Sequence, residues 1–180
     1  MSPATATPSD TSSSSLIAAT LAVGALLSLA YAGWALTARR GIFADFAQGR
    51  TVSVDDARSS DVLDTVLLVA AAAVTLAALV WWLSRMLTKR TSGDWVDKAG
   101  MAVSLLGATA VIVGLAMTNR VTSAAGQVAQ GGRGVDATSV VATGFALLAV
   151  GLLIGIFAQG GHRAPDGGAN MRPATGHQGW

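Results

Sequence analysis

Residues 15–38 form an unbroken apolar stretch, SLIAATLAVGALLSLAYAGWALTA, that contains no charged residue and no proline. An α-helix rises about 1.5 Å per residue, so a helix of this length crosses a hydrocarbon core of roughly 30 Å with some tilt. Three further stretches of the same kind cover residues 65–84, 99–119 and 137–161. The sequence therefore predicts an all-α integral membrane protein, in which residues 15–161 form a bundle of four transmembrane helices.

The two ends of the chain have a different composition. Residues 1–14, MSPATATPSDTSSS, are small and polar, and residues 162–180 are rich in Gly, Pro and polar residues. Both segments are predicted to be disordered, because they have too little apolar surface to bury. Ala30-Tyr31-Ala32 resembles a signal-peptidase site, but no basic residue precedes Arg39 and the apolar stretch continues past it, which favours a membrane span.

Composition limits the kinds of partner. Hydrophobic residues make up 52% of the chain and charged residues 12%, and the net charge of +2 is too small for a nucleic-acid-binding protein. The lipid bilayer is the predicted partner, together with other membrane proteins or a second copy of the chain. The absence of Glu, the two Lys and the abundance of Ala, Gly and Val are typical of a bacterial genome of high GC content.

The residues that most membrane enzymes and pumps require are missing from the apolar stretches. No ionisable residue lies inside them, Asp64 being at an edge, and both histidines, His162 and His177, lie in the tail. Without Cys there is no thiolate ligand, and without inward His or Glu there is no site for haem or a di-metal centre. We therefore expect no catalytic residue, no cofactor and no metal, and we expect that the chain is not an enzyme.

Small residues recur at helical spacing and predict where the helices pack closely. Gly151 and Gly155 form a GxxxG motif, which lets two backbones approach inside a bilayer. The predicted packing positions are Gly24, Ser28, Ala32, Gly107, Gly114, Gly151 and Gly155.

Aromatic and basic residues stand at the ends of the first two stretches. Such residues favour the headgroup region, so they are predicted to anchor the helices at the membrane surface. The predicted anchors are Trp34, Arg39, Arg40, Trp81, Trp82 and Arg85.

The loop between the first two stretches carries two local signals. Ile42, Phe43 and Phe46 give residues 41–46 an apolar side that could lie in the membrane interface. Ser53 precedes Asp56 with the spacing of a capping box, which predicts that the second helix starts before the membrane does.

The distribution of Lys and Arg only weakly favours one orientation of the chain in the membrane. Each side of a four-span arrangement carries six Lys and Arg residues, but residues 85–98 concentrate four bases, including both Lys, near two helix ends. The positive-inside rule then places this loop and both termini in the cytoplasm, with the chain in the cell membrane.

The two halves of the chain share collinear matches. Ala47-Gln48-Gly49 corresponds to Ala129-Gln130-Gly131, and Val54-Asp55 corresponds to Val135-Asp136. These matches predict a tandem repeat of two helix–loop–helix units, related by a rotation near 180° about the membrane normal. Coincidence between two sequences of similar composition is the alternative.

Residues 31–86 also resemble a known family. An Arg pair, the segment Gly49-Arg-Thr-Val-Ser-Val-Asp-Asp-Ala57, an acidic helix start at Asp61 and the closing Trp82-Leu-Ser-Arg85 follow in that order. In this order of features the segment resembles a family of actinobacterial multi-pass membrane proteins of unknown function. The resemblance implies a multi-pass membrane fold and no particular activity.

Two functions fit these features. The first is a structural or interaction role, as an accessory subunit, an adaptor or a self-associating membrane component. The second is a small transporter or channel without charged residues in the membrane. Such a channel would need a lining of hydroxyl groups, for which the candidates are Thr20, Ser28, Thr75, Ser104, Thr109 and Thr143. Back-bonding of these hydroxyls within their own helices, or hydrogen bonds between helices, is the alternative explanation.

Overall fold

The computed structural model describes residues 9–88, 95–121, 123–124 and 126–161. The described residues are helical apart from turns and short connections, and they include no β-strand. The elements are α1 (Ser9–Trp34), the π-helical turn η1 (Ala35–Arg39), α2 (Arg40–Ala47), α3 (Val54–Thr88), α4 (Trp95–Thr118) and α5 (Gln127–Gly161). Four helical segments are long and apolar enough to cross a membrane, which confirms the predicted all-α membrane fold.

The first helix is longer than the sequence indicated at both ends. It begins at Ser9 rather than Ser15, inside the segment predicted to be disordered, and it continues through η1 and α2 to Ala47. The apolar residues after Arg40 therefore do not form a separate segment in the membrane interface. They extend the helix, because Phe43 and Ala47 pack against glycines of α5.

Gly49 ends this long helix. It has a φ of +71°, its N–H donates to the Phe46 carbonyl at 3.0 Å, and the Arg50 N–H donates to the Asp45 carbonyl at 2.9 Å. This pair of hydrogen bonds is a Schellman motif, in which a glycine takes up the left-handed conformation after the last turn.

Replacing Gly49 with alanine is expected to destabilise the protein by about 1–2 kcal/mol, because a Cβ disfavours the left-handed conformation. The free energy of unfolding, measured by SDS titration in mild detergent, reports the change. Gly41→Ala is the matched control, since Gly41 lies in a helix and an added Cβ would meet nothing within 4 Å. Equal stability of the two variants would contradict the expectation.

The third helix starts early, as the capping signal predicted. The Ser53 hydroxyl accepts a hydrogen bond from the Asp56 N–H at 3.0 Å and donates one to the Asp56 carboxylate at 2.6 Å. Ser53 thus acts as the N-cap of α3, which begins at Val54, well before the apolar stretch at residue 65.

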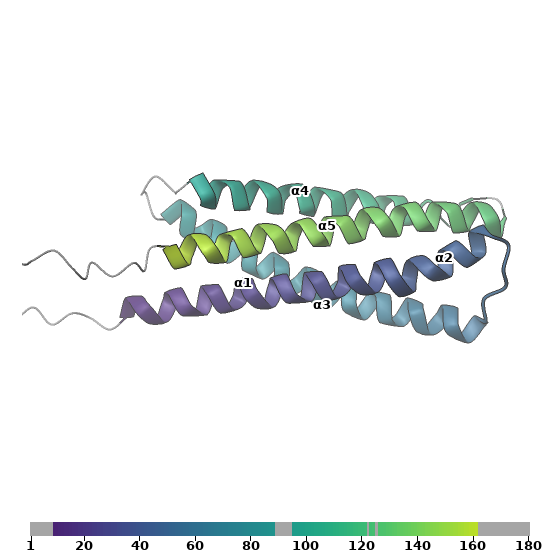
Figure 1. The fold of residues 1–180 in the computed structure, drawn as a ribbon, viewed down its shortest axis with the longest axis horizontal. Helices are drawn as coiled ribbons and strands as arrows, with labels where there is room; N and C mark the ends of the chain where they lie inside the picture. The colour runs from purple at the N-terminus through teal and green to yellow at the C-terminus, as the bar shows by residue number, and fades with distance from the viewer. Residues whose placement is uncertain (1–8, 89–94, 122, 125, 162–180) are drawn as a thin grey trace, which may run out of the picture.

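α5 is the central helix of the bundle. It packs most extensively against α4, and it also contacts α1, η1 and α2. Figure 1 shows α4, α5 and α1 side by side along the long axis, while α3 runs behind them at an angle. α3 packs along α1 and η1 and has no extended backbone contact with α4 or α5.

This packing lacks the symmetry that the repeat predicts. A two-fold rotation would pair the contact between α1 and α5 with an equivalent contact between α4 and α3. The first of these contacts is extensive and the second is minimal. The matched segments lie against each other, since an added Cβ on Gly131 would meet the backbone of Ala47. Common ancestry of the halves remains a prediction.

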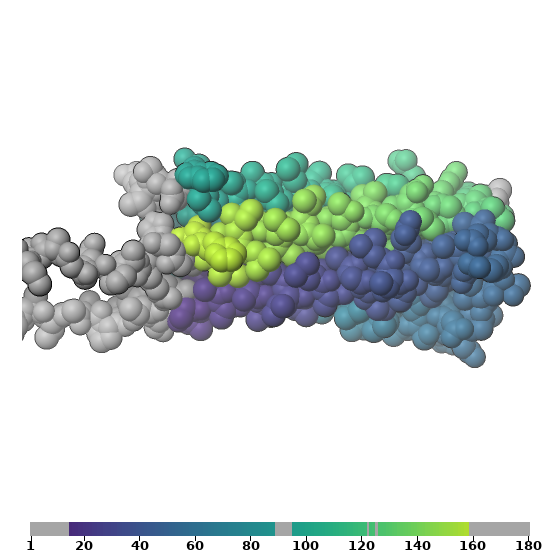
Figure 2. Space-filling model, in the orientation of Figure 1, coloured from purple at the N-terminus to yellow at the C-terminus, as the bar shows by residue number. Residues whose placement is uncertain are grey.

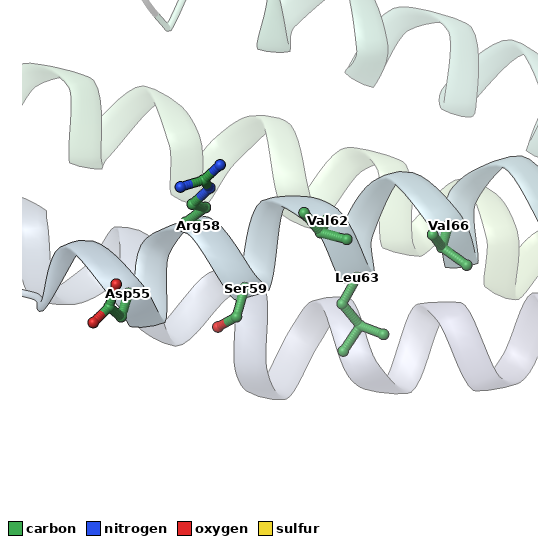
Figure 3. Close-up of a pocket in the computed structure, with 6 residues that line it drawn as sticks. All are labelled: Asp55, Arg58, Ser59, Val62, Leu63 and Val66. Carbon is green, nitrogen blue, oxygen red and sulfur yellow. The ribbon is translucent and has the colours of Figure 1, made fainter.

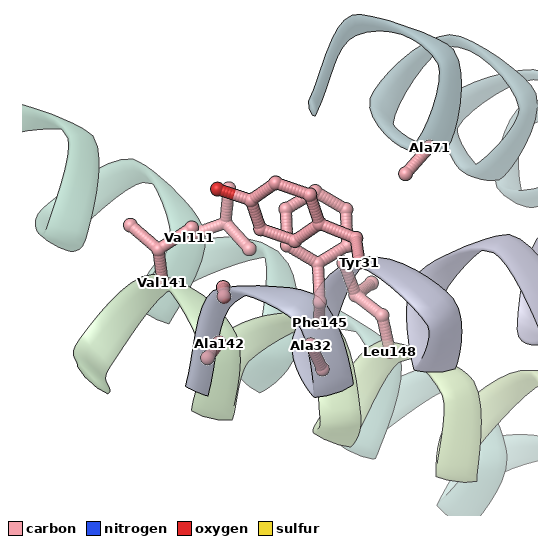
Figure 4. Packing of buried hydrophobic residues seen from close by; sticks show 9 residues of the cluster. Tyr31, Ala32, Ala71, Val111, Val141, Ala142, Phe145 and Leu148 are labelled. Carbon is pink, nitrogen blue, oxygen red and sulfur yellow. The ribbon is translucent and has the colours of Figure 1, made fainter. Parts of the chain in front are cut away.

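Two buried clusters form the core. One surrounds Tyr31 and Phe145, whose ring centroids are 4.6 Å apart, and Figure 4 shows the two rings side by side among small aliphatic residues. The other lies toward the opposite end and includes Leu21, Leu152 and Trp82. Both clusters combine residues of α1, α3, α4 and α5, so the four spanning helices share one continuous interior.

Charged residues mark the two ends of the apolar part of the bundle. On α3, Asp64 and Arg85 are separated by about 32 Å of helix, which matches the hydrocarbon thickness of roughly 30 Å. Asp64 lies level with Arg39, because the two side chains are 3.9 Å apart. We use the term cap for the helices beyond this level, which comprise α2, residues 54–63 of α3 and residues 127–136 of α5. In Figure 2, α3 emerges from behind the other helices at this end.

Candidate functional site

The most polar contact between spanning helices lies where the chain leaves the membrane. We call it the Arg39 cluster, and its residues are Tyr31, Arg39, Phe43, Ser60, Asp61 and Asp64. It joins α1, η1 and α2 to the first half of α3.

The π-helical turn directs the side chains of this cluster. η1 spans Ala35–Arg39, and the Arg40 N–H donates to the Ala35 carbonyl. A π-turn accommodates an extra residue, which rotates the following helix by about 100° relative to an uninterrupted α-helix. Arg39, the last residue of this turn, reaches α3, and Phe43, one turn later, contacts Gly134 of α5.

Arg39 makes four contacts. Its guanidinium lies 2.5 Å from the Asp61 carboxylate and 3.9 Å from that of Asp64, and Nη1 donates to the Ser60 hydroxyl at 3.3 Å. The guanidinium carbon also lies 4.8 Å from the centre of the Phe43 ring, which is cation–π geometry. The Arg39 side chain is only 13% exposed, so these contacts replace most of its water.

Tyr31 connects the cluster to the apolar core. Its hydroxyl donates to the Asp64 carboxylate at 3.0 Å, while its ring packs against Phe145 of α5. Asp64 therefore has both a hydrogen-bond donor from α1 and a cation from η1. A carboxylate at this depth needs such partners, because an unpaired charge near hydrocarbon is costly.

The two carboxylates of the cluster differ in their surroundings. The Asp64 side chain is 23% exposed, whereas that of Asp61 is 66% exposed. Solvent screens the pairing of Arg39 with Asp61, so that ion pair contributes little stability, and the pairing with Asp64 is the less screened one. Together these contacts tie α3 to α1 at the membrane boundary.

The sequence predicted Arg39 only as a surface anchor and placed Asp64 only at an edge. Two signals could have indicated the cluster: Asp61 and Asp64 lie three residues apart on one helix face, and Arg39 follows Tyr31 by two turns. No sequence pattern showed the π-turn that brings these residues together.

The predicted packing residues all lie at buried positions. Backbones approach closely between α4 and α5, where an added Cβ on Gly107 would lie 2.6 Å from the Leu148 nitrogen and one on Gly151 would lie 2.7 Å from the Gly100 carbonyl. Gly155 instead faces the Trp82 ring, and Ser28 shares a buried hydrogen bond of 3.0 Å with Thr75 of α3. The remaining buried members of the set are Gly24, Ala32 and Gly114.

The predicted anchors behave differently from one another. Trp81 is 40% exposed and faces outward, Arg40 is exposed, and Trp34 and Arg85 are half-buried. The prediction of a surface anchor is wrong for Trp82, which is only 2% exposed and lies inside the bundle. The physical reason is that Gly100 and Gly155 leave room for its indole ring, which a Cβ on either residue would approach within 3 Å.

The hydroxyl groups proposed as a channel lining do not share one path. Thr20, Thr109 and Thr143 each donate to a carbonyl four residues earlier in their own helix. Ser28 and Thr75 bond to each other between α1 and α3, while Ser104 is buried beside Gly151 of α5. Five of the six hydroxyls thus match the two alternative explanations, back-bonding and interhelical hydrogen bonding. The Ser104 hydroxyl is buried and has no hydrogen-bond partner among the described residues.

A shallow depression lies on the outer face of the first half of α3. Figure 3 shows its lining, and all six residues belong to this one helix: Asp55, Arg58, Ser59, Val62, Leu63 and Val66. Nothing from a second helix closes it, so it has the character of an open surface rather than a binding cleft. Within the part of the chain that the structure describes, no group of three or more metal-ligating side chains comes together.

Comparisons with protein-family models, with curated proteins and with solved structures find no match to this chain.

Proposed function

We propose that this protein is a structural or interaction component of the cell membrane, acting as an accessory subunit, an adaptor or a self-associating unit rather than as an enzyme. The observation that carries the proposal is the use of its polar groups. The Arg39 cluster and the hydrogen bond between Ser28 and Thr75 join α1 and η1 to α3, and Thr109 and Thr143 bond within their own helices. The contacts between helices fix the helices relative to each other, which is what a scaffold in the membrane requires.

The close backbone contacts support the same proposal. Between α4 and α5 there is no space even for a Cβ at Gly107, Gly144 or Gly151. A channel along this contact would need the two helices to separate. The alternative function, a small transporter or channel, therefore gains no support from the contact between α4 and α5.

The experiment compares two outward positions on different helices. Leu76 of α3 and Ile112 of α4 are 63% and 67% exposed, so each is accessible to lipid or to a partner. A photo-crosslinking amino acid is placed at one position at a time in the full chain, in its native membranes, and the complex is isolated in mild detergent. In parallel, the purified protein is reconstituted in liposomes for ion-flux and dye-release measurements.

The expected result is a crosslink from one of the two positions to one protein or to a second copy, in a complex of fixed composition, without flux. Lipid adducts alone at both positions, combined with liposome flux, would contradict the proposal and favour the channel.

The orientation of the chain in the membrane is tested separately with reporters fused after Trp180. We propose cytoplasmic termini, and a reporter active only outside the cytoplasm would refute that placement.

A further inference from the structure

α3 is attached to the bundle unevenly along its length. Between Ala71 and Trp82 it buries a regular stripe, made of Ala71, Thr75, Ala78 and Trp82. Between Val54 and Ala70 the only buried residue is Ser60, which belongs to the Arg39 cluster. The second half of the helix is therefore held by a buried stripe. In the first half, Leu67 and Leu68 are partly buried against the core, and residues 54–66 are held mainly by polar contacts.

Trp82 provides the firm attachment. Its ring enters the bundle and lies between Gly100 of α4 and Gly155 of α5. With 2% of its surface exposed, the indole contacts neighbours on all sides. Dispersion contacts of a buried aromatic ring are collectively large, and they do not depend on a single geometry-sensitive bond.

The opposite end has no comparable apolar attachment. Val62 is 61% exposed, Leu63 is 44% exposed and Val66 is 59% exposed, and the apolar residues of this half that pack against the core, Leu67 and Leu68, are only partly buried. Beyond these two leucines, four polar contacts join this end to α1 and η1: the pairing of Arg39 with Asp61 and with Asp64, the hydrogen bond to Ser60, and the hydrogen bond from Tyr31 to Asp64. Three of these four contacts use the guanidinium of Arg39.

We propose that α3 is a pivoting helix, fixed at Trp82 and held against α1 at its other end by the Arg39 cluster. Loss of the Arg39 contacts lets the first half of α3 swing away from α1, while the Trp82 end stays in place. About 30 Å of helix separate Val62 from Trp82, so a rotation of roughly 15° moves Val62 by about 8 Å. This motion occurs within one chain, so the inference does not depend on the proposed interaction role.

The test uses pairs of spin labels, because a chain without cysteine accepts them without background labelling. One pair, at Val62 of α3 and Val128 of α5, reports on the cap end, and a second, at Leu83 of α3 and Phe157 of α5, reports on the Trp82 end. All four positions are exposed. Distances are measured by pulsed electron paramagnetic resonance in lipid nanodiscs, in the full chain and in its Arg39→Gln variant.

In Arg39→Gln we expect longer and broader distances for the first pair and unchanged distances for the second. Arg40→Gln is the matched control, since Arg40 is the exposed neighbour in sequence and should leave both pairs unchanged. Unchanged distances at the cap end in Arg39→Gln would overturn the proposal. So would equal changes at both ends, because they would indicate general loosening rather than a pivot.

A second variant tests the same contacts if the Arg39→Gln variant does not fold. Asp61→Asn combined with Asp64→Asn removes the acceptor charges and leaves Arg39 in place. It should give the same lengthening at the cap end with the Trp82 end unchanged. If this variant keeps the distances of the unmodified chain, the charges do not hold α3 and the proposal is wrong.

Discussion

Trp82→Ala is expected to destabilise the folded bundle by about 2–3 kcal/mol. Replacing a buried tryptophan in a water-soluble core costs roughly 3–5 kcal/mol, part of which is the transfer of apolar surface to water. In a membrane the unfolded helices remain in hydrocarbon. The loss of stability therefore comes chiefly from the lost packing contacts and from the cavity left between Gly100 and Gly155. The measurement is the free energy of unfolding from SDS titration in mild detergent.

Trp81→Ala provides the control for this prediction. Trp81 is adjacent in sequence and identical in type, but it is 40% exposed and faces outward. We expect its replacement to change the free energy of unfolding by less than about 1 kcal/mol, because few packing contacts are lost. If the two variants lose the same stability, Trp82 is not the internal attachment described above.

Gly107→Leu is expected to destabilise the contact between α4 and α5 by about 2–3 kcal/mol. Its Cβ alone would lie 2.6 Å from the Leu148 nitrogen and 2.7 Å from the Gly144 carbonyl, and backbone atoms cannot move aside as a flexible side chain can. The two helices must separate, which forfeits the close packing that stabilises helix pairs in a bilayer. The same unfolding titration measures the loss.

Gly33→Leu is the matched control, because Gly33 lies on the exposed side of α1 and an added Cβ would meet nothing within 4 Å. We expect no loss of stability there, and a small gain from the better helix propensity of leucine. A stable Gly107→Leu variant with unchanged helix content would show that α4 and α5 do not approach as closely as described.

The spanning helices themselves could be predicted from the sequence. Uncharged stretches of about 20 residues have few alternatives to a membrane helix, because only a helix satisfies the backbone groups internally in hydrocarbon. The N-cap of α3 at Ser53 was also predictable, since N-capping depends on residues close in sequence. Local rules were insufficient for the long first helix, whose extension past Arg39 depends on packing of Phe43 against Gly134 of α5.

The composition and spacing of this chain thus determined its class, its four spans and the small residues that allow close packing. Only the tertiary structure decided which helices meet, that Trp82 lies inside rather than at the surface, and that Arg39, Asp64 and Tyr31 form one cluster. The physical reason is the range of the interactions. Transfer into lipid and helix capping act on each segment alone, whereas burial of a tryptophan or pairing of an arginine depends on a neighbour distant in sequence.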